Sequence, residues 1–133
     1  MKTKLLFLVI IISSMFFSSC DYLFNIRSYD VIIHNDDTDK SITSVYVRPG
    51  NTNDNWSKNK ILDVILPDEE STIILTEGTY EFKVITEDDY YSYEMYMSAL
   101  TINSNTRLNF CYECYKDDKN VKVIKTPKKK PLE

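Results

Sequence analysis

Glycine and histidine are scarce in this chain, whose 133 residues include two glycines and one histidine. A glycine-rich loop that cradles phosphate groups is therefore excluded, because such a loop needs several glycines close together. A Ser-His-Asp triad would have to use His34, which ends an apolar run and begins the polar turn His34-Asn35-Asp36-Asp37. Adjacent side chains on a turn rarely point at one another productively. We therefore do not expect an enzyme.

The chain also lacks an apolar run long enough to cross a membrane. Its longest run, from Leu5 to Phe17, has 13 positions and includes Ser13 and Ser14. A membrane-spanning helix needs about 20 apolar residues. The short run, with Lys2 and Lys4 before it, has the length of a signal-peptide core instead.

The apolar run leads to Ser18-Ser19-Cys20. Together, residues 1–20 resemble a bacterial lipoprotein signal peptide, with a charged start, an apolar middle and a lipobox that ends in the acylated cysteine. The resemblance implies that a signal peptide helix within residues 1–19 is removed and that acyl chains on Cys20 anchor the protein to an inner or outer membrane of the bacterial cell envelope. One alternative stays open. Phe17 is a bulky residue for a lipobox, and ordinary cleavage nearby would release a soluble protein.

Basic residues are few in the body of the chain. Residues 20–121 carry nine Lys and Arg against nineteen Asp and Glu. Nucleic acid is therefore not an expected partner, because phosphate binding needs clustered basic residues. Residues 122–133 carry five Lys and one Glu, and we expect residues 126–133 to form a basic, disordered tail.

Two acidic clusters could suggest a cation site, Asp36-Asp37-Thr38-Asp39 and Glu87-Asp88-Asp89. The first lacks the glycine and the distal glutamate of an EF-hand loop. We expect both clusters to be solvated turns, and no metal or cofactor.

Short runs of β-branched and aromatic residues recur along the chain with alternating apolar and polar positions, which is typical of strands. No window shows a helical period over three turns. We predict an all-β domain over residues 28–125, an antiparallel Ig-like or transthyretin-like β-sandwich of about seven to nine strands, joined by linker residues 20–27 to the anchor. The predicted strands are Tyr29–His34, Ser41–Arg48, Ile61–Leu66, Thr72–Leu75, Tyr80–Glu87, Tyr91–Met97, Leu100–Asn103, Thr106–Tyr112 and Asn120–Lys125.

A second resemblance covers roughly residues 29–103. Asn55-Trp56-Ser57 precedes Leu66-Pro67 and then Gly78-Thr79-Tyr80-Glu81-Phe82. This order resembles small exported β-sandwich modules of bacteria, in which a polar tryptophan loop precedes a strand, a proline turn and a Gly-x-Tyr hairpin. The resemblance bears on architecture and implies no catalytic residues. We expect Gly78 to take a positive φ in that hairpin.

Cys111 and Cys114 form the one motif in the sequence that suggests redox chemistry. In an exported protein they are expected to form a local structural disulfide or to remain as two free thiols, ahead of a metal or redox role. A disulfide requires the strand to bend, because three residues of strand span about 10 Å and end on opposite faces. Zinc is disfavoured, since a structural site needs four ligands. We predict no helix after Cys111 that would lower its pKa.

Aromatic side chains give the best indication of binding. Trp56, the only tryptophan, lies in the long polar segment Asn51–Lys60, and Tyr90 and Tyr96 are expected to face outward from the tyrosine-rich strand. Exposed tyrosines favour interfaces and suit stacking on sugars. The alternatives are that Trp56 caps the sandwich edge and that the tyrosines only pair with a neighbouring strand. We therefore expect a lipid-anchored, non-catalytic binding or structural module with an envelope protein or a glycan as partner. The alternative is an envelope redox or metal-binding protein.

Overall fold

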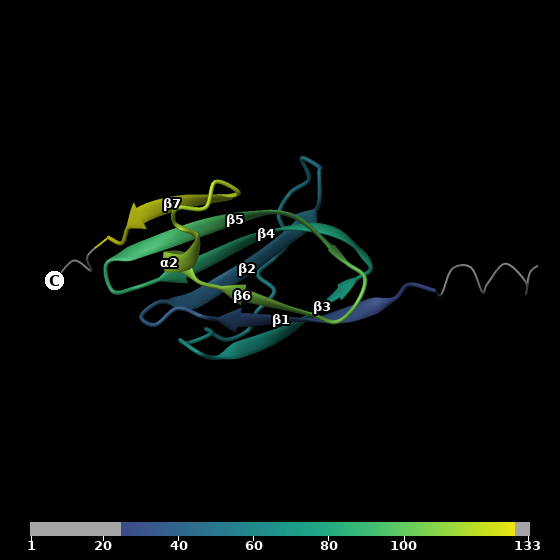
Figure 1. The fold of residues 1–133 in the computed structure, drawn as a ribbon, viewed down its shortest axis with the longest axis horizontal. Coiled ribbons are helices and arrows are strands. Elements are labelled where there is room, and N and C mark those ends of the chain that lie inside the picture. The colour runs from purple at the N-terminus through teal and green to yellow at the C-terminus, as the bar shows by residue number, and fades with distance from the viewer. Residues whose placement is uncertain (1–24, 130–133) are drawn as a thin grey trace, which may run out of the picture.

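The computed structural model describes residues 25–129, which form two β-sheets and one helical turn (Figure 1). The elements are β1 (Ser28–Asn35), β2 (Ser41–Pro49), β3 (Glu70–Thr76), β4 (Gly78–Glu87), β5 (Tyr91–Ile102), β6 (Thr106–Phe110), α2 (Tyr112–Tyr115) and β7 (Val121–Pro127). The all-β prediction is confirmed. Cys20 and the predicted signal peptide lie outside the described residues. Within the described part of the chain, no helix is long and apolar enough to span a membrane.

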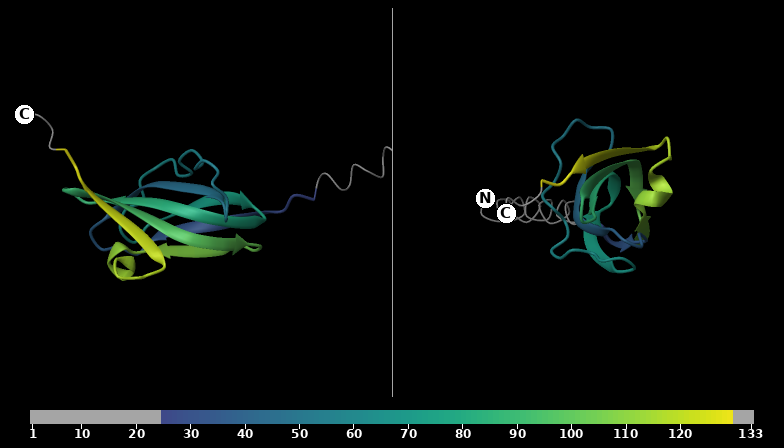
Figure 2. Two further views of the ribbon diagram at one scale, coloured as in Figure 1. Left: turned by 90° about the horizontal axis from the view of Figure 1, so that it is seen from above. Right: turned by 90° about the vertical axis from the view of Figure 1, so that its left-hand side faces the viewer.

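The strands form two facing sheets, as Figure 2 shows end-on in its right panel. One sheet has the order β3-β1-β6 and the other β2-β4-β5-β7. Four strand pairs are antiparallel, as predicted, but β1 and β6 run parallel. This difference arises because β6 enters the smaller sheet after a crossover from β5 in the larger one, so no hairpin forces the antiparallel direction.

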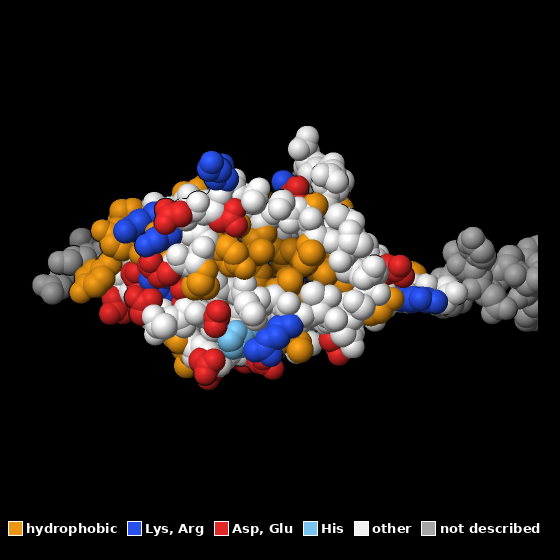
Figure 3. Space-filling view, in the orientation of Figure 1, with side chains coloured by type: hydrophobic (Ala, Val, Ile, Leu, Met, Phe, Trp, Pro, Cys, Tyr) orange, Lys and Arg blue, Asp and Glu red, His pale blue; other side chains and the backbone are white. Residues whose placement is uncertain are grey.

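Alternation along the strands places one face of each sheet in the core. In β4, Phe82 and Val84 point inward. Glu81, which precedes Phe82, and Lys83, which lies between the two, point outward. The buried hydrophobic core comprises Val31, Ile33, Ile42, Val45, Val47, Ile61, Ile65, Ile73, Leu75, Phe82, Val84, Met95, Ile102 and Phe110. Hydrophobic side chains also gather at the centre of one broad face, between β5 and β6, and charged side chains gather at the end where α2 lies (Figure 3).

The predicted strand Ile61–Leu66 is wrong. The segment makes a single bridge, between Ile65 and Ile42 of β2. A regular strand would place Ile61, Asp63 and Ile65 on one face and bury the Asp63 carboxylate, which costs several kcal/mol unless it is paired. The irregular path instead buries Ile61 and Ile65 and leaves Asp63 at the surface.

Other strand boundaries also differ from the prediction. Tyr91–Met97 and Leu100–Asn103 are joined in the single strand β5, with an irregularity opposite Tyr80 and Phe82 of β4. The predicted strand Thr106–Tyr112 ends at Phe110, where the chain turns toward α2. β7 continues to Pro127, beyond the predicted domain end at residue 125.

Because glycines are few, other residues adopt the left-handed backbone conformation in the turns. The prediction of a positive φ at Gly78 is wrong. Gly78 has no positive φ, because β3 and β4 belong to different sheets and do not form a hairpin. The left-handed positions in the described residues are instead Asn51, with φ 60°, and Asp68, with φ 64°. Asn and Asp tolerate this conformation better than other residues with a Cβ.

Candidate binding groove

Trp56 and Tyr96 lie together on the outer face of the larger sheet, although 40 positions separate them in the sequence. Tyr96 points outward from β5 because its neighbour Met95 points into the core. The loop that carries Trp56 is fixed to the edge of β2, where the Ser57 N–H donates to the Val47 carbonyl over 2.9 Å and the Val47 N–H donates to Ser57 Oγ over 3.0 Å. The two rings meet edge to face, with centroids 6.0 Å apart.

Cationic side chains surround this aromatic pair. The Arg48 guanidinium lies 4.5 Å from the Trp56 ring centroid, and the Lys83 ammonium lies 5.4 Å from it. Arg48 Nε also donates a hydrogen bond to the Glu81 carboxylate, which is its register partner on β4. A cation over an aromatic ring contributes about 0.5–1 kcal/mol at an exposed site. These contacts hold Trp56 on the sheet.

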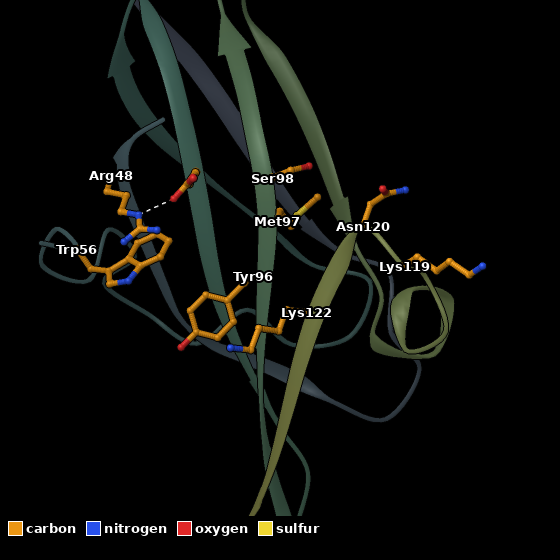
Figure 4. Close-up of a pocket in the computed structure, with 9 residues that line it drawn as sticks. Arg48, Trp56, Tyr96, Met97, Ser98, Lys119, Asn120 and Lys122 are labelled. Atoms are coloured by element: carbon orange, nitrogen blue, oxygen red, sulfur yellow. Dashed lines mark hydrogen bonds and ion pairs between the residues drawn. The ribbon is translucent and has the colours of Figure 1, made fainter. Parts of the chain in front are cut away.

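The surface is hollowed beside Trp56 and Tyr96. A groove of about 480 Å³ runs across β5 from the Trp56 side toward the turn before β7 (Figure 4). We call it the Trp56–Tyr96 groove. Its lining combines aromatic, basic and neutral polar groups, namely Arg48, Trp56, Glu81, Tyr96, Met97, Ser98, Lys119, Asn120 and Lys122.

The Tyr96 hydroxyl is held in its neutral form. It donates a hydrogen bond to the Glu94 carboxylate, and this bond, together with burial, raises the pKa of Tyr96 to about 12. The ring therefore presents an uncharged aromatic surface at physiological pH.

Tyr90 belongs to a different part of the surface. It lies in the turn between β4 and β5 with 73% of its surface exposed, and it does not line the groove. Its carbonyl accepts a hydrogen bond from the Lys128 N–H over 2.9 Å. The structure therefore brings together two of the three aromatic residues singled out in the sequence.

Cys111 and Cys114 are joined by a disulfide, with their Cα atoms 5.2 Å apart. The bend that this pairing requires is present, because β6 ends at Phe110 and α2 begins at Tyr112. The prediction that no helix follows Cys111 is wrong. Cys111 is the N-cap of α2, and its sulfur accepts a hydrogen bond from the Cys114 N–H over 3.2 Å.

A buried charged cluster beside α2 was not predicted. Asp37, expected on a solvated turn, is 4% exposed, and so is Lys40. Lys40 Nζ lies 2.9 Å from Asp39 and 3.7 Å from Glu113, and 5.1 Å from the Tyr112 ring centroid. Burial alone would lower the pKa of Lys40, but the hydrogen bond and charge of Asp39, with the other carboxylates, raise it. The only feature of the sequence that could have indicated this cluster is the adjacent pair Asp39-Lys40.

Metal ligands do not converge in residues 25–129, where no three His, Cys, Asp or Glu side chains are placed to hold an ion. The single histidine, His34, lies on β1 with Nε2 3.5 Å from the Asp68 carboxylate.

The fold and the groove define a small β-sandwich-like protein with an aromatic and cationic surface groove. Comparison of the chain with protein-family models, with curated proteins and with solved structures gives no significant match in any of the three.

Proposed function

We propose that this chain is a lipid-anchored protein of the bacterial cell envelope that binds its ligand without catalysis in the Trp56–Tyr96 groove. The convergence of Trp56 and Tyr96 on one hollowed surface carries the proposal. Concave sites with aromatic walls and a few polar groups are the usual form of ligand sites. The anchor rests on the lipobox resemblance of residues 1–20, and the Ig-like or transthyretin-like assignment is supported by the division of seven strands into three and four.

The ionisable groups of the groove favour binding over catalysis. Arg48 is paired with Glu81, and the Tyr96 hydroxyl is engaged by Glu94. A pKa of about 12 makes Tyr96 a poor proton donor at neutral pH, because general acids work best with a pKa near the operating pH.

Site-specific photocrosslinking in living cells tests the groove. A photoreactive amino acid at Ser98 should capture one defined species, and Trp56→Ala should abolish that capture. The same reagent at Tyr90, which is exposed outside the groove, serves as the control. Equal capture at positions 90 and 98, or capture unaffected by Trp56→Ala, would show that the groove is not the binding site.

Replacement of Cys20 tests the anchor. Cys20→Ala should move the protein from the detergent phase to the aqueous phase on detergent partitioning, because two or more acyl chains hold a protein stably on a membrane. A Cys20→Ala protein that stays in the detergent phase would contradict lipidation at this residue.

A redox role is the second candidate, and the N-cap position of Cys111 favours it. The Cys114 N–H points at the Cys111 sulfur and would stabilise a thiolate there after reduction. Titration of the reduced protein with a thiol reagent should then give a pKa for Cys111 clearly below the usual value of about 8.5. An unshifted value would exclude this candidate.

A further inference from the structure

We infer that the ligand of the Trp56–Tyr96 groove is a saccharide that carries acidic groups. This inference rests on the proposed function, since it names the chemical class that the same groove would bind. Charge, hydrogen-bonding groups and the position of the groove on the sheet support it.

The groove is basic although the chain is acidic. Its lining includes Arg48, Lys119 and Lys122 against Glu81 alone, in a chain whose formal net charge is −4. Arg48 and Glu81 pair with each other, whereas Lys119 and Lys122 form no salt bridge with any of residues 25–129. Lys122 Nζ lies 5.8 Å from the Tyr96 ring centroid, and no carboxylate of the described residues neutralises either lysine. Both therefore complement a ligand with negative charge.

The remaining polar groups suit hydroxyl-rich molecules. The Ser98 hydroxyl and the Asn120 side-chain amide line the groove and make no hydrogen bond with the described residues through their side chains. Both groups can donate and accept, as sugar hydroxyls do. Trp56 and Tyr96 add aromatic ring surface against which the C–H face of a sugar ring packs. Part of this surface is covered by the cations of Arg48, Lys83 and Lys122.

The aromatic part of the groove lies over sheet that is already paired on both sides. β4 is hydrogen-bonded to β2 and β5, and β5 is hydrogen-bonded to β7 over Tyr91–Met97, although beyond Met97 the β7 side of β5 has no strand partner among the described residues. An extended peptide binds most readily by adding to a free sheet edge, where backbone groups remain unpaired. A ligand on this face meets side chains, which a saccharide recognises without backbone pairing.

Binding to saccharides that differ only in charge provides the test. The full-length protein, purified in detergent, is applied to immobilised polygalacturonate, hyaluronan and phosphorylated mannan, each beside a neutral counterpart such as fully methyl-esterified polygalacturonate. We expect retention on at least one acidic member and not on its neutral counterpart. Binding should weaken as sodium chloride is raised, because salt screens exposed charges.

Variants of the groove show whether retention occurs there. Trp56→Ala should abolish it, and the double variant Lys119→Glu/Lys122→Glu should weaken it by on the order of tenfold or more. Tyr90→Ala and Arg27→Glu are the matched controls, because both residues are exposed and neither lines the groove. Both controls should bind as the unmodified protein does.

Each other result overturns the inference in a recognisable way. Equal retention on acidic and neutral counterparts would show a saccharide ligand whose charge is irrelevant. If no saccharide retains the protein and the photoreactive group at position 98 captures a protein in cells, the groove binds a protein partner. The proposed binding function would then stand and the saccharide inference would be wrong. Failure of both experiments would overturn the inference and the proposed function together.

Discussion

Asp37 is a carboxylate that the fold buries against the backbone of α2. Both of its oxygens lie 3.0 Å from the Tyr112 nitrogen, which donates to them. Burial is the largest influence on Asp37 and raises its pKa above 3.8, although the hydrogen bond from Tyr112 and the charge of Lys40 act in the opposite direction. The folded protein therefore binds the Asp37 proton more tightly than the unfolded chain does.

Asp37→Asn should consequently reveal a stability difference that depends on pH. The contribution of Asp37 is fully present below pH 3.8 and is lost as the pH rises through the raised pKa. The free energy of unfolding of the unmodified protein, minus that of Asp37→Asn, should therefore fall in urea titrations as the pH rises from below 3.8 through the raised pKa of Asp37. Asp88→Asn should give the opposite slope, because hydrogen bonds from Tyr93, Tyr90 and Tyr91 outweigh desolvation and lower the pKa of Asp88. A rising difference for Asp37 would mean that its anion is the stabilised form.

The residues of the groove were only partly predictable from the sequence. Trp56 and Tyr96 were identifiable because a tryptophan in a polar loop and a tyrosine opposite buried positions are visible in the pattern itself. Lys119, Asn120 and Lys122 were not identified as site residues, although Asn120 and Lys122 fall on a predicted strand, because their position beside Ser98 depends on how β7 returns along β5. Contacts of that kind are set by tertiary structure and leave no local signal.

At the scale of elements, α2 is a single turn whose existence depends on its surroundings. Four residues form too few hydrogen bonds to offset the cost of helix nucleation. Three contacts compensate: the disulfide, the hydrogen bonds that the Tyr112 N–H donates to Asp37, and the Glu113–Lys116 ion pair at 2.7 Å. The sequence could not predict α2, because a helical period is not detectable over four positions.

Replacement of both cysteines by serine tests this dependence. Cys111→Ser/Cys114→Ser should lower the free energy of unfolding by about 2 kcal/mol or less, since the disulfide closes a very short loop. Hydrogen exchange should quicken at the Tyr115 and Lys116 amides, which bond to the Cys111 and Tyr112 carbonyls. The unmodified protein with a reducing agent should show the same pattern. Unchanged exchange at these two amides would mean that α2 forms without the disulfide.

At the scale of the whole molecule, the segment of residues 57–66 links the β2 edge of the larger sheet to β1, the central strand of the smaller sheet. Its Lys60 N–H donates to the Val45 carbonyl of β2, and Asn59 Oδ1 accepts from the Val45 N–H. The buried side chain of Asn35 on β1 donates to the Ile65 carbonyl over 2.9 Å. The segment therefore satisfies part of the β2 edge, which would otherwise be free to pair with another chain, and ties it to the smaller sheet.

Substitutions within this segment distinguish a structural link between the sheets from a surface loop. Ile65→Ala should lower the free energy of unfolding by about 2–5 kcal/mol, because Ile65 is 2% exposed and its removal leaves a cavity between the sheets. Leu62→Ala is the control, since Leu62 is fully exposed in the same segment and should change stability by less than about 0.5 kcal/mol. Both variants should still unfold in one cooperative transition, measured by circular dichroism and tyrosine fluorescence in urea. Equal losses for Ile65→Ala and Leu62→Ala would contradict this role, because Ile65 lies in the core and Leu62 does not.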